Sequence, residues 1–154
     1  MGSPEEYERK IVLRGVTAYF VAVIAGYLVA SAIATVEVLL TVSGFGLTPS
    51  FADVLASIWM DWLGMVGSYL PLIALALAIA LPVVAKLRRW VGGEPLPWYL
   101  AAGFVALVAL HLIMEATLGL VGFASARSIP GLLLQGVAGG IAGWCFCRMQ
   151  GAQS

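Results

Sequence analysis

The chain contains few charged residues. Only 10% of its 154 residues are Asp, Glu, Lys or Arg, against about 25% in an ordinary soluble domain. The eight basic and eight acidic residues cancel, so the chain lacks the uniform positive field by which proteins bind nucleic acids. Nucleic acid is therefore excluded as a principal partner.

Cysteine and histidine are also scarce. The two cysteines, Cys145 and Cys147, lie together near the C-terminal end, so no disulfide framework is expected. His111 is the single histidine, which excludes bis-histidine haem ligation within one chain. P-loops, nucleophile elbows and paired-cysteine redox motifs are absent from the sequence. An enzyme is therefore the less favoured class, and the cofactor stays unknown.

Apolar residues are in large excess. They make up 62% of the chain, against about 45 to 50% in a soluble domain. A chain of this size has too few polar groups to cover itself in water, so lipid must be its main solvent. We expect an all-α, multi-pass protein of the cell (inner) membrane, with the lipid bilayer as its first partner.

Four apolar runs predict a four-transmembrane-helix bundle over residues 15–148, between a cytoplasmic N-terminal tail (1–14) and a C-terminal tail (149–154). The first run contains about 29 residues, too long for a signal peptide, whose apolar region has about 7 to 15. The predicted spans cover about residues 15–43, 62–85, 98–124 and 129–146.

Two features modify the second span. Ser50 and Asp53 have the spacing of a capping box, which predicts a short interfacial helix opening at Phe51, before the second span. Pro71 and Pro82 lie inside the span, where each removes a backbone hydrogen bond. A kink is expected near Pro71.

Basic residues are distributed unevenly between the predicted loops. Seven of the eight lie on one side of the predicted membrane, and only Arg127 lies on the other. The side with more Lys and Arg faces the cytoplasm in most multi-pass proteins. Both chain ends are therefore expected in the cytoplasm. The seven residues are Arg9, Lys10, Arg14, Lys86, Arg88, Arg89 and Arg148.

Small residues repeat at four-residue spacing in two spans. Helices in lipid associate where small side chains let their backbones approach, so such repeats indicate contact faces. Packing within the bundle and pairing with a second protomer or a larger membrane complex both remain open. The repeats include Gly26 and Ala30 in the first span and Gly136, Gly139, Gly140 and Gly143 in the fourth.

Polar residues from three spans fall at one predicted depth. Glu37, Glu115 and Gln135 lie six to nine residues from the outer ends of their spans, so at about 1.5 Å per residue their depths agree within one helical turn. His111 lies one turn below Glu115 on the same face. Asp61 would lie at the mouth, with Ser68 two turns further in on the same side. We expect these six residues to line a polar pocket open to the outside.

Two interpretations of this pocket remain open. The polar groups could hold the bundle together, at about 0.6 to 2 kcal/mol per contact. They could instead bind or pass a proton, a cation or a small polar solute, as embedded ionisable residues often do. His111 and Glu115, at i and i+4, are also weak candidates for metal ligands.

Three functional classes follow from these features. The first is a small transporter or channel with an outward-facing intramembrane polar site. Its glycine faces could pair protomers, so an oligomer is expected. The second is an accessory or anchor subunit of a larger membrane complex. The third is a membrane-embedded metal-dependent or lipid-modifying enzyme.

Overall fold

The computed structural model describes residues 4–46, 48–118 and 128–150. Within these residues the protein is all-helical, with five helices and no strand. Four of the helices are long and apolar enough to cross a membrane. The helices are α1 (Pro4–Ser43), α2 (Phe51–Gly64), α3 (Tyr69–Val91), α4 (Pro95–Leu118) and α5 (Ile129–Gln150).

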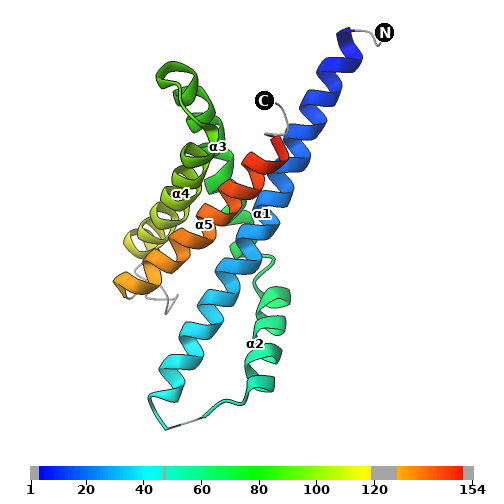
Figure 1. The fold of residues 1–154 in the computed structure, drawn as a ribbon. Helices are drawn as coiled ribbons and strands as arrows, with labels where there is room; N and C mark the ends of the chain where they lie inside the picture. Colours follow the sequence, from blue (N-terminus) through cyan, green and yellow to red (C-terminus); the bar gives the residue numbers. More distant parts are fainter. Residues whose placement is uncertain (1–3, 47, 119–127, 151–154) are drawn as a thin grey trace.

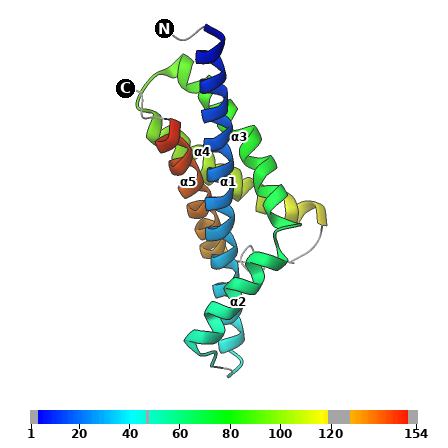
Figure 2. The ribbon, with the colours of Figure 1, turned by 90° about the vertical axis from the view of Figure 1, so that its right-hand side faces the viewer.

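The four long helices form a ring. α5 packs against α4 and α1, and α3 packs against the same two helices, while α2 packs along α1. Figures 1 and 2 show that both chain ends and the α3–α4 turn lie at one end of the bundle. We call this the basic end, because Arg14, Arg89 and Arg148 lie there. At the opposite end, the α1–α2 hairpin extends beyond the ends of α4 and α5 (Figure 1).

Helix α1 begins in the segment that was expected to be a cytoplasmic tail. It starts at Pro4 and contains 40 residues, which gives it a length of about 60 Å. Proline suits the first helical position, and the acidic Glu5 and Glu6 favour the positive end of the helix dipole. Glu6 also pairs with Lys10 one turn later, at 2.9 Å. Because of these local preferences, α1 begins well before the apolar segment that was predicted to start at about residue 15.

The capping box predicted at the start of α2 is present. The Ser50 hydroxyl accepts a hydrogen bond from the Asp53 backbone N–H, and the Asp53 carboxylate accepts from the Ser50 hydroxyl at 2.7 Å and backbone N–H at 2.9 Å. These bonds, the one from the hydroxyl first, lower the pKa of Asp53. The box therefore fixes Phe51 as the first residue of α2.

The second span begins later than the sequence predicts. α2 ends at Gly64, residues 65–68 form a turn, and α3 starts at Tyr69. The predicted kink near Pro71 is therefore wrong: Pro71 lies in the first turn of α3, where backbone N–H groups have no partner within the helix. Pro82 does lie inside α3.

The turn between α3 and α4 depends on two glycines. Gly92 and Gly93 have φ angles of 80° and 96°, in a region that favours glycine because it has no Cβ. α4 then starts at Pro95, three residues before the predicted boundary at Trp98. As in α1, proline is accommodated in the first helical turn.

The large apolar side chains divide between the bundle interior and the membrane. On α3, the residues Tyr69, Ile73 and Leu77 are completely buried. Leu75 and Ile79, on the opposite face, are each 61% exposed. Such an apolar outer surface suits lipid rather than water.

Helices α4 and α5 approach so closely that their backbones touch. A Cβ added at Gly139 would overlap the Gly103 carbonyl, and one added at Gly143 would overlap the Tyr99 carbonyl. Gly136 faces the Phe104 ring in the same way. Gly136, Gly139 and Gly143 of α5 therefore face α4 inside the bundle.

We predict that Gly139→Ala destabilises the bundle, because its methyl group would force α4 and α5 apart. Overpacking of this kind costs about 1 to 3 kcal/mol. Gly140→Ala is the matched control, since its Cβ would meet the Leu100 carbonyl at an ordinary 3.7 Å. The measurement is the free energy of unfolding in mixed detergent micelles. Equal stability of the two variants would contradict the packing described.

Candidate functional site

Three buried side chains from three helices form a continuous hydrogen-bonded network. The Tyr69 hydroxyl lies 3.1 Å from His111 Nε2 and 3.1 Å from Gln135 Oε1. His111 Nδ1 lies 2.8 Å from the Leu107 carbonyl. Gln135 Nε2 donates to the Ala30 carbonyl at 3.1 Å. We call these three side chains and two carbonyls the His111 network.

The His111 network joins all four spanning helices. Tyr69 opens α3, His111 lies on α4, Gln135 on α5 and Ala30 on α1. The bond between Tyr69 and Gln135 connects two helices that face each other across the ring. Small residues on α1, such as Ala30 with 0% exposure, let Gln135 reach the backbone of α1.

The network is sealed from its surroundings. Tyr69 and Gln135 are 0% exposed and His111 is 1% exposed. The rings of Tyr69 and His111 also pack edge to face, with centroids 5.8 Å apart. A buried polar group is costly unless it is hydrogen-bonded, and inside a membrane water offers no alternative partner. These bonds are therefore needed to keep the three side chains inside.

The predicted chamber brings only part of its residues together. His111 and Gln135 meet through Tyr69, whereas Glu115 lies on an exposed part of α4 one turn further on. Glu37 lies seven residues beyond Ala30, about 10 Å along α1. The predicted depths were counted from the outer end of each span, on the assumption that these ends lie at one level. In the structure α1 extends further than α4 and α5 (Figure 1).

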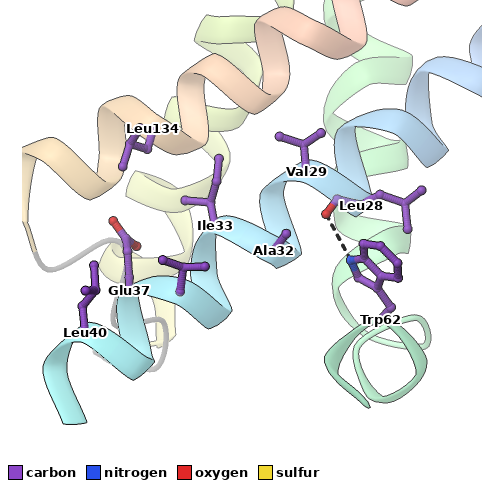
Figure 3. Close-up of a pocket in the computed structure, with 9 residues that line it drawn as sticks. Leu28, Val29, Ala32, Ile33, Glu37, Leu40, Trp62 and Leu134 are labelled. Atoms are coloured by element: carbon purple, nitrogen blue, oxygen red, sulfur yellow. Dashed lines mark hydrogen bonds between the residues drawn. The ribbon is translucent and has the colours of Figure 1, made fainter. Parts of the chain in front are cut away.

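Glu37 instead lines a separate groove between α1, α2 and α5, of about 430 Å³. Figure 3 shows its carboxylate pointing toward the start of α5, near Leu134. Trp62 lies at the other end of this groove and donates its indole N–H to the Leu28 carbonyl at 3.1 Å. Apart from Glu37 the groove walls are almost entirely apolar.

Asp61 belongs to a second group of contacts, which fastens the end of α2 to α1. Its carboxylate accepts a hydrogen bond from the Thr35 hydroxyl at 2.7 Å. The Tyr27 hydroxyl donates to the Trp62 carbonyl at 2.6 Å, and the Ser31 hydroxyl contacts the Met65 sulfur at 3.6 Å. Asp61 is therefore held against α1 and is half-buried.

Ser68 does not share the position of Asp61. The sequence argument placed both on one continuous helix, but α2 ends between them. Ser68 is exposed and its hydroxyl points back to the Met65 carbonyl, at 3.4 Å. The turn at residues 65–68 therefore separates the two side chains.

Several residues of these contacts were not singled out from the sequence. Tyr69 was missed because it falls in the middle of the predicted second span. Tyr27, Ser31 and Thr35 were missed although they repeat at four-residue spacing, directly beside the small-residue repeat of α1. A row of polar side chains beside a small-residue face is a signal for polar contacts between helices.

Metal ligands are not clustered in the described part of the chain. Its His, Cys, Asp and Glu residues include no group of three that could hold a metal ion. Cys145 is half-buried and Cys147 is buried, both as free thiols. Arg127, expected on the outer side, lies outside the described residues.

We predict that Tyr69→Phe destabilises the bundle more than Tyr19→Phe does. The first variant removes the hydroxyl that bridges His111 and Gln135, and so leaves two buried groups without that partner. The second variant removes only a bond to the Ala74 carbonyl. Each bond between membrane helices contributes about 0.6 to 2 kcal/mol. Thermal unfolding in detergent measures both variants, and an equal or larger loss in Tyr19→Phe would refute the role of Tyr69.

We compared the chain with known families, proteins and structures. No family model, no curated protein and no solved structure matches this chain. The structure itself gives the broad class: four long apolar helices, compatible with a small multi-pass membrane protein in contact with lipid.

Proposed function

We propose that the chain binds a proton at His111 and couples this proton to the packing of its four spans, as a small proton-linked transporter or channel does. The basic end would face the cytoplasm, by the positive-inside rule. One observation carries the proposal. The contacts of the His111 network need one more hydrogen atom than the network contains when His111 is neutral.

The ring nitrogen Nδ1 of His111 carries a hydrogen. His111 Nδ1 lies 2.8 Å from the Leu107 carbonyl oxygen, and a carbonyl oxygen only accepts. Nδ1 must therefore carry a hydrogen. In a neutral imidazole the other nitrogen, Nε2, then has none and can only accept.

The Tyr69 hydroxyl lies between two possible acceptors. It has a single hydrogen atom but lies 3.1 Å from two atoms, His111 Nε2 and Gln135 Oε1. With a neutral His111, the hydrogen satisfies only one of these two acceptors. With a protonated His111, Nε2 donates to the hydroxyl, and the hydroxyl donates to Gln135. All the contacts are then hydrogen bonds at once.

Rotating the Gln135 amide does not remove the deficit. The amide nitrogen would then donate to Tyr69, and the hydroxyl would donate to His111. However, Gln135 Oε1 would face the Ala30 carbonyl, so two acceptors would meet where the present bond spans 3.1 Å. Among the contacts between the described residues, either orientation leaves the neutral network one hydrogen short.

Protonation of His111 therefore changes how α3, α4 and α5 are joined. Burial disfavours the charge, while the additional hydrogen bond favours it. Two opposing effects of this kind suit a site that gains and loses a proton during a cycle. The acidic residues on the same half of the protein are Glu37 on α1, Asp53 and Asp61 on α2, and Glu115 on α4. α3 and α5 carry their charged residues only near the basic end.

A second candidate function is an accessory or anchor subunit of a larger membrane complex. It is supported by the α1–α2 hairpin, which extends beyond the bundle (Figure 1) and exposes large apolar side chains. On α2, Phe51, Leu55 and Trp59 follow at four-residue spacing and are 77%, 52% and 59% exposed. A helix from a partner could cover this face.

The proton hypothesis is tested by flux into liposomes that contain a pH-sensitive dye. We expect the reconstituted protein to admit protons down an imposed gradient, because His111 can exchange its proton across the network. His111→Gln should reduce the flux to that of liposomes without protein. Glu115→Gln is the matched control, since it removes an ionisable group one turn away but outside the network, and it should retain the flux.

Two results would overturn the proposal. One is full flux through the His111→Gln variant. The other is a wild-type protein that admits no protons and that mild extraction recovers with a foreign chain at a fixed ratio. The second result would favour the accessory subunit.

A further inference from the structure

A groove of about 420 Å³ lies on the other half of the protein, toward the basic end. Its walls come from all four spans and include Val16 and Tyr19 of α1, Pro82 and Ala85 of α3, and Phe146 and Gln150 of α5. We call it the basic-end groove. It is separate from the His111 network and does not depend on the proposed function.

Arginines surround the mouth of the basic-end groove. Arg14 precedes the lining residue Gly15, and Arg88 and Arg89 follow the lining residue Ala85 by three and four positions, which continues the same face of α3. Arg148 lies on the opposite face of α5, over the Trp144 ring. No acidic residue occurs within four positions of any lining residue. The groove therefore combines an apolar interior with a cationic mouth.

One hydrogen-bond donor of Arg88 is unused within the described residues. Its Nε is buried and has no hydrogen-bond partner among the described residues. The charges of Arg88 and Arg89 both act on Tyr99, which lines the groove. Arg14, in contrast, is fixed by a bond from its Nε to the Met149 carbonyl, at 3.1 Å. The mouth thus holds one anchored guanidinium and one with an unused buried donor.

We propose that the basic-end groove binds an anionic phospholipid of the leaflet at the basic end. An acyl chain would lie along Tyr19, Pro82 and Phe146, and the headgroup phosphate would accept hydrogen bonds from Arg88 and Arg89. Guanidinium groups are the preferred partners of phosphate, because their donors match its oxygens. Basic pockets between spanning helices on the cytoplasmic side bind such headgroups in other membrane proteins.

The charges favour a lipid over a second protein helix at this groove. A transmembrane helix would present an apolar surface to Arg88 and Arg89 and would supply no anion to balance their charges. A phospholipid supplies both an apolar chain and an anionic group at the depth where the groove ends. A zwitterionic lipid has the same chain but carries a compensating positive charge.

The test is native mass spectrometry of the full chain in mild detergent, titrated with phosphatidylglycerol or phosphatidylcholine of identical acyl chains. We expect one phosphatidylglycerol to bind more tightly than phosphatidylcholine. Each basic residue near an anionic lipid contributes a factor of about five in affinity. The double variant Arg88→Gln/Arg89→Gln should therefore bind phosphatidylglycerol roughly 25-fold more weakly and phosphatidylcholine as before.

The matched control is Lys10→Gln/Lys86→Gln, which removes the same charge from the same end. Lys10 pairs with Glu6 and Lys86 lies over the Trp90 ring, 5.6 Å from its centroid, so neither is needed at the groove. This control should retain tight binding. An equal loss in both double variants would show a general charge effect and overturn the site. Equal binding of the two lipids by the wild type, or a dimer in place of bound lipid, would overturn it without any variant.

Discussion

A polar side chain that enters the interior of a membrane protein must bring its hydrogen-bond partners with it, because neither water nor lipid supplies them. In this protein that requirement falls on Tyr69, His111 and Gln135, which are buried together at the meeting point of the four spans. Their bonds fix the relative depth of α3, α4 and α5, and the bond to Ala30 adds α1. In the proposed function, the same requirement makes the protonation state of His111 decide which of these bonds form.

Close backbone contact makes this arrangement sterically feasible. Gly103 and Gly139 bring α4 and α5 together, and Gly26 lies where an added Cβ would be only 3.0 Å from the Ala142 side chain. Small residues therefore form the closest contacts between the helices, while large apolar side chains such as Ile73 fill the interior and others such as Leu75 face outward. Contacts of this kind depend on shape, because lipid gives helices no hydrophobic reason to associate.

Much of the fold could be predicted from the sequence, because composition and apolar length determine which segments suit lipid. The four apolar helices were predicted, and the capping box at Ser50 gave the first residue of α2 correctly. The break at residues 65–68 was not predicted, since an apolar stretch continues through it. The extent of α1 was underestimated, because helix propensity does not end where apolar residues do.

The candidate site was harder to predict, because it depends on the relative heights of helices. His111 and Gln135 were both named, and the structure joins them through Tyr69, which was not. Glu115 was expected beside them but lies one turn further along α4, where the helix is exposed. Counting residues from the outer ends gives depth only when those ends are level. The overhanging α1–α2 hairpin breaks that condition.

The proton on His111 can be observed directly, because this is the only histidine in the chain. Protein labelled with ¹⁵N-histidine and freed of any histidine-containing tag would give imidazole nitrogen signals from His111 alone. The account predicts a neutral ring protonated at Nδ1 at high pH, and conversion to an imidazolium protonated at both nitrogens as the pH falls. A neutral ring protonated at Nε2, or a ring whose signals stay unchanged until the protein unfolds, would contradict it.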